Sequence, residues 1–344
     1  MSTSIFYVDR EGIKPRSGVL LVAAIVGISL IEMVLGEVAV PALIAAYFVT
    51  RVGTHARGGK RWLYMSIAIV VGTGLSLLAL VAGDNTVRAV LLWTAAIYFT
   101  GLAVAYGRSI FYACYFFVFW LLLVMLESSR SAGEPWHYVA SFLIGGVVAL
   151  IVMTARIRFG LIDDSPTDPD GTPQLRDVAT SDIGVFALMW ALTMAVAIAV
   201  GYTFWSVEPF WVASTLLVVM QPDVAKGTRT GIQRGIGSAT GGLLALALIA
   251  IFPGFVGSDL LLVYFLAVTA LCVAFYRANY LIYAFFMTQA VVIYYGHEVG
   301  DFGEAGGQRI LGVLLGVVIG LVGLGVQARV IASRHQRNQA STGS

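Results

Sequence analysis

A short polar stretch between two apolar segments carries most of the residues that could bind a small anion. It follows the apolar run that starts at Pro209. It begins at Gln221, and its charged residues are Asp223, Lys226, Arg229 and Arg234. A guanidinium group can hold a carboxylate through two parallel hydrogen bonds. The stretch is therefore either the entrance of a path for anions or an ordinary charged turn.

Arg234 is the strongest candidate for direct contact with an anion. On a helix it shares a face with Gly231, Gly237 and Gly241. Small residues allow helices to pack closely in lipid, and this is the favoured interpretation of the glycines. They could also leave room for a substrate beside the guanidinium group. Trp211 and Thr215, which precede the turn, are further candidates for the anion path.

Basic residues from both halves of the chain could form a ring at one end of such a path. The first half offers Arg51, Lys60, Arg61 and Arg108, and the second half offers Lys226, Arg229, Arg234 and Arg277. A ring of this kind would raise the local concentration of carboxylates. The alternative is that these residues only fix the orientation of the protein in the membrane.

Glu32 is the clearest carboxylate within an apolar run, and it could carry a proton that is coupled to transport. The alternative is that it reaches outward to the membrane surface together with Glu37. The sequence has no metal-binding pattern, no catalytic pair and no nucleotide-binding loop, because the similar stretches that begin at Gly53 and Gly235 have the wrong spacing or context. We therefore expect no enzyme activity, no cofactor and no metal.

The composition indicates the elements that must position these residues. Of the 344 residues, 59% are hydrophobic and only 12% are charged, and the mean hydropathy is +0.87. These values exclude a soluble protein and predict an all-α integral membrane protein. Cys114 and Cys272 lie in apolar runs and are expected to be core residues, and the polar first residues do not resemble a removable signal peptide.

The apolar segments predict about twelve transmembrane helices in two groups of six. The first group comprises 18–36, 38–52, 62–82, 88–106, 109–127 and 136–156, and the second comprises 183–203, 207–221, 231–252, 259–276, 279–296 and 308–328. The predicted divisions are an N-terminal segment 1–17, a first repeat 18–158, a linker 159–182, a second repeat 183–328 and a tail 329–344. We expect the linker and the tail to be irregular.

The distribution of charge predicts that both termini are cytoplasmic. With that orientation, only Arg88, Arg130 and Arg309 of the 21 basic residues fall on the outer side. The acidic residues show the opposite bias. An even number of spans in each half would also place two copies of one unit parallel to each other.

An internal duplication is predicted from matches between the halves. A shift of about 168 residues superposes Pro41 on Pro209, and a shift of about 169 superposes Arg108 on Arg277. Gly145 and Gly146 then fall near the region from Gly312 to Gly316. The alternative is chance similarity between apolar segments.

The second half resembles the fusaric-acid-resistance-like (FUSC) family. The resemblance rests on Pro209-Phe210-Trp211, Thr215, Gln221-Pro222, Arg229 or Thr230, Arg234, Gly237 and Gly241-Gly242. The family includes aromatic carboxylic acid exporters and is related to plant aluminium-activated malate transporters. The resemblance implies two six-helix halves and export of an organic, aromatic carboxylate across a bacterial inner membrane. The chain departs from the family pattern in two ways. Its linker is short, and its first half lacks the Gln-Pro pair.

These observations together predict a secondary exporter of organic anions. A passive organic-anion channel and a non-transporting membrane scaffold remain alternatives. The expected partners are the lipid bilayer and a small organic anion. A homodimer is left open, and no nucleic acid is expected.

Overall fold

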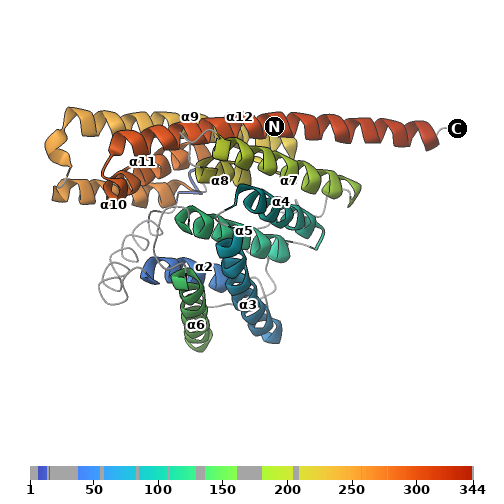
Figure 1. The fold of residues 1–344 in the computed structure, drawn as a ribbon, viewed down its shortest axis with the longest axis horizontal. Coiled ribbons are helices and arrows are strands. Elements are labelled where there is room, and N and C mark those ends of the chain that lie inside the picture. The colour runs from blue at the N-terminus through green and yellow to red at the C-terminus, as the bar shows by residue number, and fades with distance from the viewer. Residues whose placement is uncertain are drawn as a thin grey trace. The chain divides into compact units, whose positions relative to one another are not determined.

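The computed structural model describes residues 7–13, 15, 38–54, 58–82, 85–106, 108–128, 136–160, 180–203, 209–256, 258–276 and 278–342. Over these residues the chain forms eleven α-helices and two short 3-10 helices, with no strand (Figure 1). The predicted all-α fold is confirmed for this part of the chain. The predicted first span, 18–36, and Glu32 within it lie outside the described residues.

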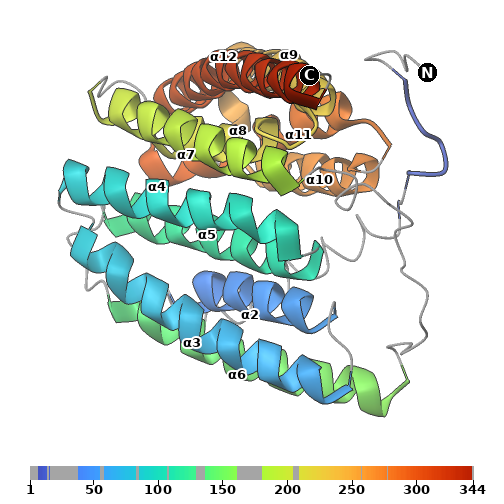
Figure 2. The same cartoon turned by 90° about the vertical axis from the view of Figure 1, so that its right-hand side faces the viewer.

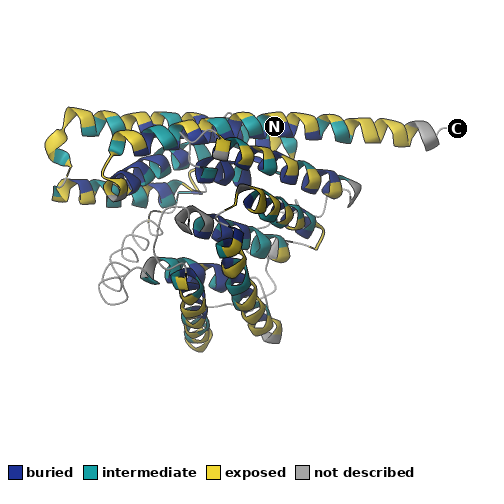
Figure 3. Cartoon of the chain, viewed as in Figure 1, coloured by how far each residue is buried: buried dark blue, intermediate teal, exposed yellow. Residues whose placement is uncertain are grey.

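Within the described part of the chain, six helices are long and apolar enough to cross a membrane. They are α3 (Gly58–Ala82), α4 (Thr86–Leu102), α6 (Trp136–Arg158), α7 (Thr180–Thr203), α9 (Val224–Ile251) and α12 (Phe302–Thr342). Their exposed large apolar side chains include Val70, Leu243 and Val318. Exposed positions recur along these helices (Figure 3). Apolar side chains on a helix surface are stable when they contact lipid. The chain is therefore a multi-pass membrane protein.

The other five helices are α2 (Ala39–Thr54), α5 (Arg108–Ser128), α8 (Pro209–Val219), α10 (Asp259–Phe275) and α11 (Tyr280–Val299). The shortest is α8, whose 11 residues extend over about 16 Å, roughly half the thickness of the hydrocarbon core. Nine residues of α8 are buried. This short helix is therefore enclosed by the rest of the protein.

The helices form two compact units, one from Ile28 to Ala195 and the other from Val196 to Ser344 together with Met1–Gly27. In the first unit α2 packs on α6, α3 packs on α5 and α6, and α4 packs on α5 (Figure 2). In the second unit α8 packs on α12, α9 packs on α11 and α12, and α10 packs on α11. Each of these four pairings of the first unit thus has a counterpart six helices later.

One pair of glycines shows the same correspondence in atomic detail. A Cβ atom added to Gly145 of α6 would lie 2.1 Å from the carbonyl oxygen of Ala42 in α2. A Cβ atom added to Gly316 of α12 would lie 2.8 Å from the carbonyl oxygen of Val212 in α8. Both glycines therefore allow equivalent helices to approach closely. The duplication stays a prediction, and these matching contacts support it.

Two helices of the second unit are longer than the sequence analysis predicts. The helix α9 begins at Val224 rather than near residue 231, because the Asp223 side chain accepts a hydrogen bond from the Lys226 backbone N–H at 3.1 Å. The helix α12 continues to Thr342, so the prediction of an irregular tail is wrong. Its residues after Arg329 are rich in Ala, Arg and Gln, which extend an existing helix without a new nucleation cost.

The N-terminal segment contacts the turn between α10 and α11. The Asp9 backbone N–H donates to the carbonyl oxygen of Ala278 at 3.0 Å, and the Asn279 side-chain amide donates to the carbonyl oxygen of Tyr7 at 2.7 Å. The Asn279 side chain also caps α11 by accepting from the backbone of Leu281. Asn279 therefore both caps α11 and binds the N-terminal segment.

Candidate anion-binding site

Arg234 lies in the interior of the second unit, on α9. Its side chain is only 6% exposed. The Arg234 Nε donates to the Thr215 hydroxyl at 3.3 Å, and Nη1 donates to the Tyr280 hydroxyl at 2.9 Å. Both acceptors are neutral, so neither hydrogen bond removes the positive charge of the guanidinium group.

Thr215 holds its hydroxyl in a fixed direction for this contact. Its side chain is fully buried on α8, and the hydroxyl donates to the carbonyl oxygen of Trp211 at 2.8 Å. The single hydroxyl proton is thereby used, and the oxygen lone pairs face the Arg234 Nε. The predicted residues Trp211, Thr215 and Arg234 are thus brought together.

A second buried arginine contacts α8 at Trp211, one helical turn before Thr215. The guanidinium carbon of Arg309, on α12, lies 4.3 Å from the centroid of the Trp211 ring, and Arg309 is 2% exposed. The Trp211 ring also makes an edge contact with Tyr295, with a centroid distance of 5.8 Å. A guanidinium group over an indole face gains a cation–π attraction, which leaves the edge of the guanidinium free for hydrogen bonds.

Among the described residues, Arg309 has no hydrogen-bond partner for its buried Nε, and Trp211 has none for its buried Nε1. A buried donor without an acceptor costs free energy, and a buried charge costs considerably more. Both donors belong to one contact, because the guanidinium carbon of Arg309 lies over the Trp211 ring. An anion that accepted from both would remove this cost.

The two cations are arranged along one face of α8. Trp211 contacts Arg309, and Thr215 contacts Arg234. Trp211 and Thr215 are four residues apart, which corresponds to about 6 Å along a helix. The cluster of Trp211, Thr215, Arg234, Tyr280 and Arg309 is named the arginine pair site.

The remaining predicted residues of α9 and its preceding turn lie outside this site. Lys226 is exposed in the first turn of α9, and Arg229 is half-buried in the next turn. The Gln221 side-chain amide donates to the carbonyl oxygen of Val218 at 3.0 Å. The backbone carbonyl oxygen of Gln221 accepts from the Gln327 side-chain amide at 3.3 Å. In the structure Gln221 thus ties the end of α8 to α12.

The basic residues of the first unit occupy three different environments. The Arg51 guanidinium lies 6.0 Å from the centroid of the Tyr47 ring, and Arg51 is half-buried. Arg61 is 3% exposed, and its Nε donates to the carbonyl oxygen of Gly53 at 3.1 Å near the end of α2. Arg108 is the first residue of α5, and Lys60 is exposed. Arg277 lies outside the described residues. The ring across both halves stays a prediction.

The glycines beside Arg234 are occupied by helix packing. A Cβ atom at Gly237 would lie 2.4 Å from the carbonyl oxygen of Leu281, and one at Gly241 would lie 2.2 Å from that of Phe285. The backbone of α11 therefore fills the space that the sequence analysis considered for a substrate. The favoured packing interpretation of these glycines agrees with the contacts.

Arg309 and Tyr280 are absent from the residues proposed from the sequence. Arg309 was counted only as an outer-side charge, but the structure places it seven residues into α12. One signal could have identified it, because Gly312, Gly316 and Gly320 follow Arg309 at helical spacing and are buried on the same face. A charge on the small-residue face of a membrane helix points toward protein rather than lipid.

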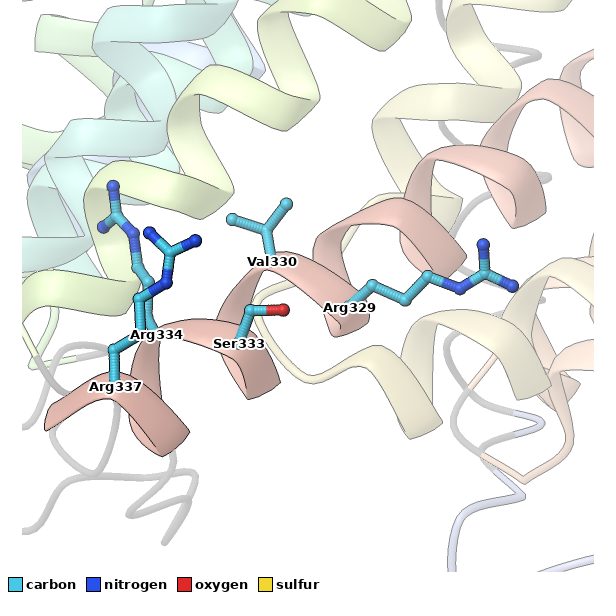
Figure 4. Close-up of a pocket in the computed structure, with 5 residues that line it drawn as sticks. All are labelled: Arg329, Val330, Ser333, Arg334 and Arg337. Atoms are coloured by element: carbon cyan, nitrogen blue, oxygen red, sulfur yellow. The ribbon is translucent and has the colours of Figure 1, made fainter. Parts of the chain in front are cut away.

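A separate hollow lies on the part of α12 beyond the predicted last span. It is lined by Arg329, Val330, Ser333, Arg334 and Arg337 (Figure 4). The Arg334 and Arg337 side chains lie beside each other, and the Arg329 side chain points away along the helix (Figure 4). All five residues belong to one helix, so this hollow is distinct from the arginine pair site.

Comparison with known families matches residues 192–323 to the family described as fusaric acid resistance protein-like. Every residue of the arginine pair site falls within the match. Neither the curated proteins nor the solved structures contain a match to the chain. The predicted resemblance to this family is therefore confirmed over these residues.

Proposed function

On the premise that residues 192–323 form a fusaric acid resistance protein-like region, we propose that the protein exports an organic, aromatic carboxylate across a bacterial inner membrane, with both termini in the cytoplasm. The observation that carries the proposal is the buried Arg309, whose Nε has no partner among the described residues. A cation held in this way at membrane depth is costly unless it serves an anion.

The arginine pair site offers chemically suitable contacts for such a substrate. The guanidinium edge of Arg309 and the indole N–H of Trp211 can donate to a carboxylate. The Trp211 and Tyr295 rings provide aromatic surface beside these donors. Arg234 adds positive charge, and the Thr215 and Tyr280 hydroxyls orient it.

Proton coupling is part of the proposal, with Glu32 as the candidate carrier. A carboxylate within an apolar run can bind and release a proton during a transport cycle. The proposal predicts that an imposed pH gradient drives accumulation of an aromatic acid in proteoliposomes that contain the purified protein. A flux that follows only the electrochemical gradient of the anion would instead indicate a channel, and no flux would favour a scaffold.

The variant Arg234→Ala tests the site. We expect it to insert and purify normally but to transport the acid at least tenfold more slowly, because the positive charge between Thr215 and Tyr280 is lost. The matched control is Arg329→Ala, which removes an exposed arginine from α12. If Arg234→Ala transports as fast as this control, the arginine pair site is not on the transport path.

A further inference from the structure

The turn between α10 and α11 is buried, and the N-terminal segment supplies its hydrogen-bond partners. Ala278 and Asn279 in this turn are 5% and 6% exposed. Buried backbone and amide groups need partners. The Ala278 carbonyl oxygen accepts from the Asp9 backbone N–H at 3.0 Å. The Asn279 side-chain amide donates to the Tyr7 carbonyl oxygen at 2.7 Å. Residues 7–9 are named the N-terminal strap.

Asn279 connects the strap to the first turn of α11. Its side-chain Oδ1 caps the helix by accepting from the backbone N–H groups of Leu281 at 2.8 Å and Ile282 at 3.3 Å. Its Nδ2 is the donor to the strap. Both atoms belong to one planar carboxamide, so a fixed direction for Nδ2 also fixes the direction of Oδ1. The strap therefore helps to determine where α11 begins.

The first turn of α11 carries a residue of the arginine pair site. Tyr280 directly follows Asn279, and its hydroxyl accepts from the Arg234 Nη1 at 2.9 Å. The first N–H groups of a helix have no partner within the helix, so loss of the cap allows its first turn to fray. Fraying would move the Tyr280 hydroxyl away from Arg234. A continuous series of contacts thus joins the strap to Arg234 within one compact unit.

We infer that the N-terminal strap controls the anion affinity of the arginine pair site. When attached, it holds Tyr280 against Arg234, and when detached it releases Tyr280 and the affinity falls. Two ordinary hydrogen bonds hold the strap, and each contributes little net free energy because water can replace the partner. The strap can therefore detach while the helices stay folded. This inference rests on the proposed function, because it names the regulation of the same site.

The variant Asn279→Ser separates the strap from the cap. Serine can cap α11, but its side chain is too short to hold the Tyr7 carbonyl oxygen. Benzoate binding to the purified full-length protein is measured by isothermal titration calorimetry. We expect about fivefold or more weaker binding by Asn279→Ser. The matched control is Asn85→Ser at the cap of α4, which should stay within about twofold of wild type. Equal affinities of the two variants would overturn the inference.

The variant Tyr280→Phe tests the route from the strap to the site. It removes the hydroxyl that Arg234 contacts and keeps the aromatic ring. The strap then has no hydroxyl to position. We expect Asn279→Ser to weaken benzoate binding by less than about twofold when it is added to Tyr280→Phe. Additive losses in the double variant would contradict the route through Tyr280.

A reciprocal measurement needs no variant. If the strap strengthens anion binding, an anion must strengthen attachment of the strap by the same factor. The measurement is hydrogen–deuterium exchange at the Asp9 amide, which donates to Ala278. We expect saturating benzoate to slow this exchange about fivefold or more in wild type, and to leave it unchanged in Tyr280→Phe. A strap with only a structural role would not respond to benzoate. Unchanged exchange in wild type, or no benzoate binding, would overturn the inference.

Transport of benzoate is measured separately in proteoliposomes. Protection of the Asp9 amide by benzoate without any flux would refute the proposed export and leave the strap in place. Flux of benzoate with no effect on the Asp9 amide would refute the strap and leave the proposed export in place.

Discussion

The variant Gly316→Ala should weaken both the fold of the second unit and its anion site. A Cβ atom at this position would lie 2.8 Å from the Thr215 Cβ and 2.8 Å from the carbonyl oxygen of Val212. Backbone cannot move out of the way as a flexible side chain can, so α12 must shift away from α8. Arg309 lies seven residues before Gly316 on α12, and the shift therefore changes its position over Trp211.

The expected magnitude follows from two opposing effects. Inserting a methyl group into a tight contact costs typically 1–3 kcal/mol of unfolding free energy. Replacing glycine by alanine within a helix returns up to about 1 kcal/mol. When the full amount of about 1 kcal/mol is returned, the net loss is about 0–2 kcal/mol. Each kcal/mol corresponds to a fall in melting temperature of roughly 2–4 °C.

Two glycine variants provide controls for this experiment. Gly145→Ala makes the equivalent contact in the first unit, at 2.1 Å from the carbonyl oxygen of Ala42, and should lower the melting temperature without changing the affinity for anions. Gly325→Ala on α12 meets no atom within 4 Å and should be neutral or slightly stabilising. These controls separate crowding from helix propensity and from the anion site.

The assay is thermal unfolding of the purified protein with and without benzoate. We expect Gly316→Ala to lose both melting temperature and several-fold affinity for the acid, and Gly145→Ala to lose melting temperature alone. The reasoning is refuted if Gly316→Ala melts at the same temperature as Gly325→Ala. It is also refuted if Gly145→Ala loses affinity as strongly as Gly316→Ala does.

Two further variants examine single hydrogen bonds. Thr215→Val keeps the side-chain shape but removes the acceptor for Arg234, so we expect a roughly tenfold weaker affinity for the acid, while Thr215→Ser should stay close to wild type. Unchanged binding by Thr215→Val would show that the hydroxyl does not orient Arg234. Asn279→Ala removes both the cap of α11 and the hydrogen bond to Tyr7. Asn85→Ala removes only the cap of α4 and should lower the free energy of unfolding by about 1 kcal/mol. We expect a larger loss for Asn279→Ala. Equal melting temperatures of these two variants would exclude a stabilising role for the N-terminal contact.

The helices could be predicted from the sequence because lipid imposes a simple rule on composition. Apolar runs bounded by polar residues gave α2 to α8 and α10 to α11 with small errors at their ends. The rule fails where a helix leaves the membrane. Residues after Arg329 are polar, yet they continue α12, because backbone hydrogen bonds stabilise a helix in water as well as in lipid.

The site could be predicted only in part, because sequence patterns report neighbours along the chain. Trp211, Thr215 and Arg234 belong to one motif, and the structure brings these three together. Arg309 and Tyr280 reach the same place from α12 and α11, through contacts that no local spacing encodes. The glycines that follow Arg309 on its face of α12 predict close helix packing, and they also place the Arg309 side chain on the face of α12 that contacts protein.

The enclosure of α8 has a consequence for how the protein responds to its membrane. A helix that faces lipid must match the thickness of the bilayer by tilting or by deforming the lipid around it. The helices α9 and α12 expose Leu243, Leu244, Leu314 and Val318, so changes in bilayer thickness act on them directly. The helix α8 is buried over nine of its residues and is far shorter than the bilayer. Hydrophobic mismatch therefore reaches the spacing of Trp211 and Thr215 only through neighbouring helices, whereas it acts directly on α9 and α12, which carry Arg234 and Arg309.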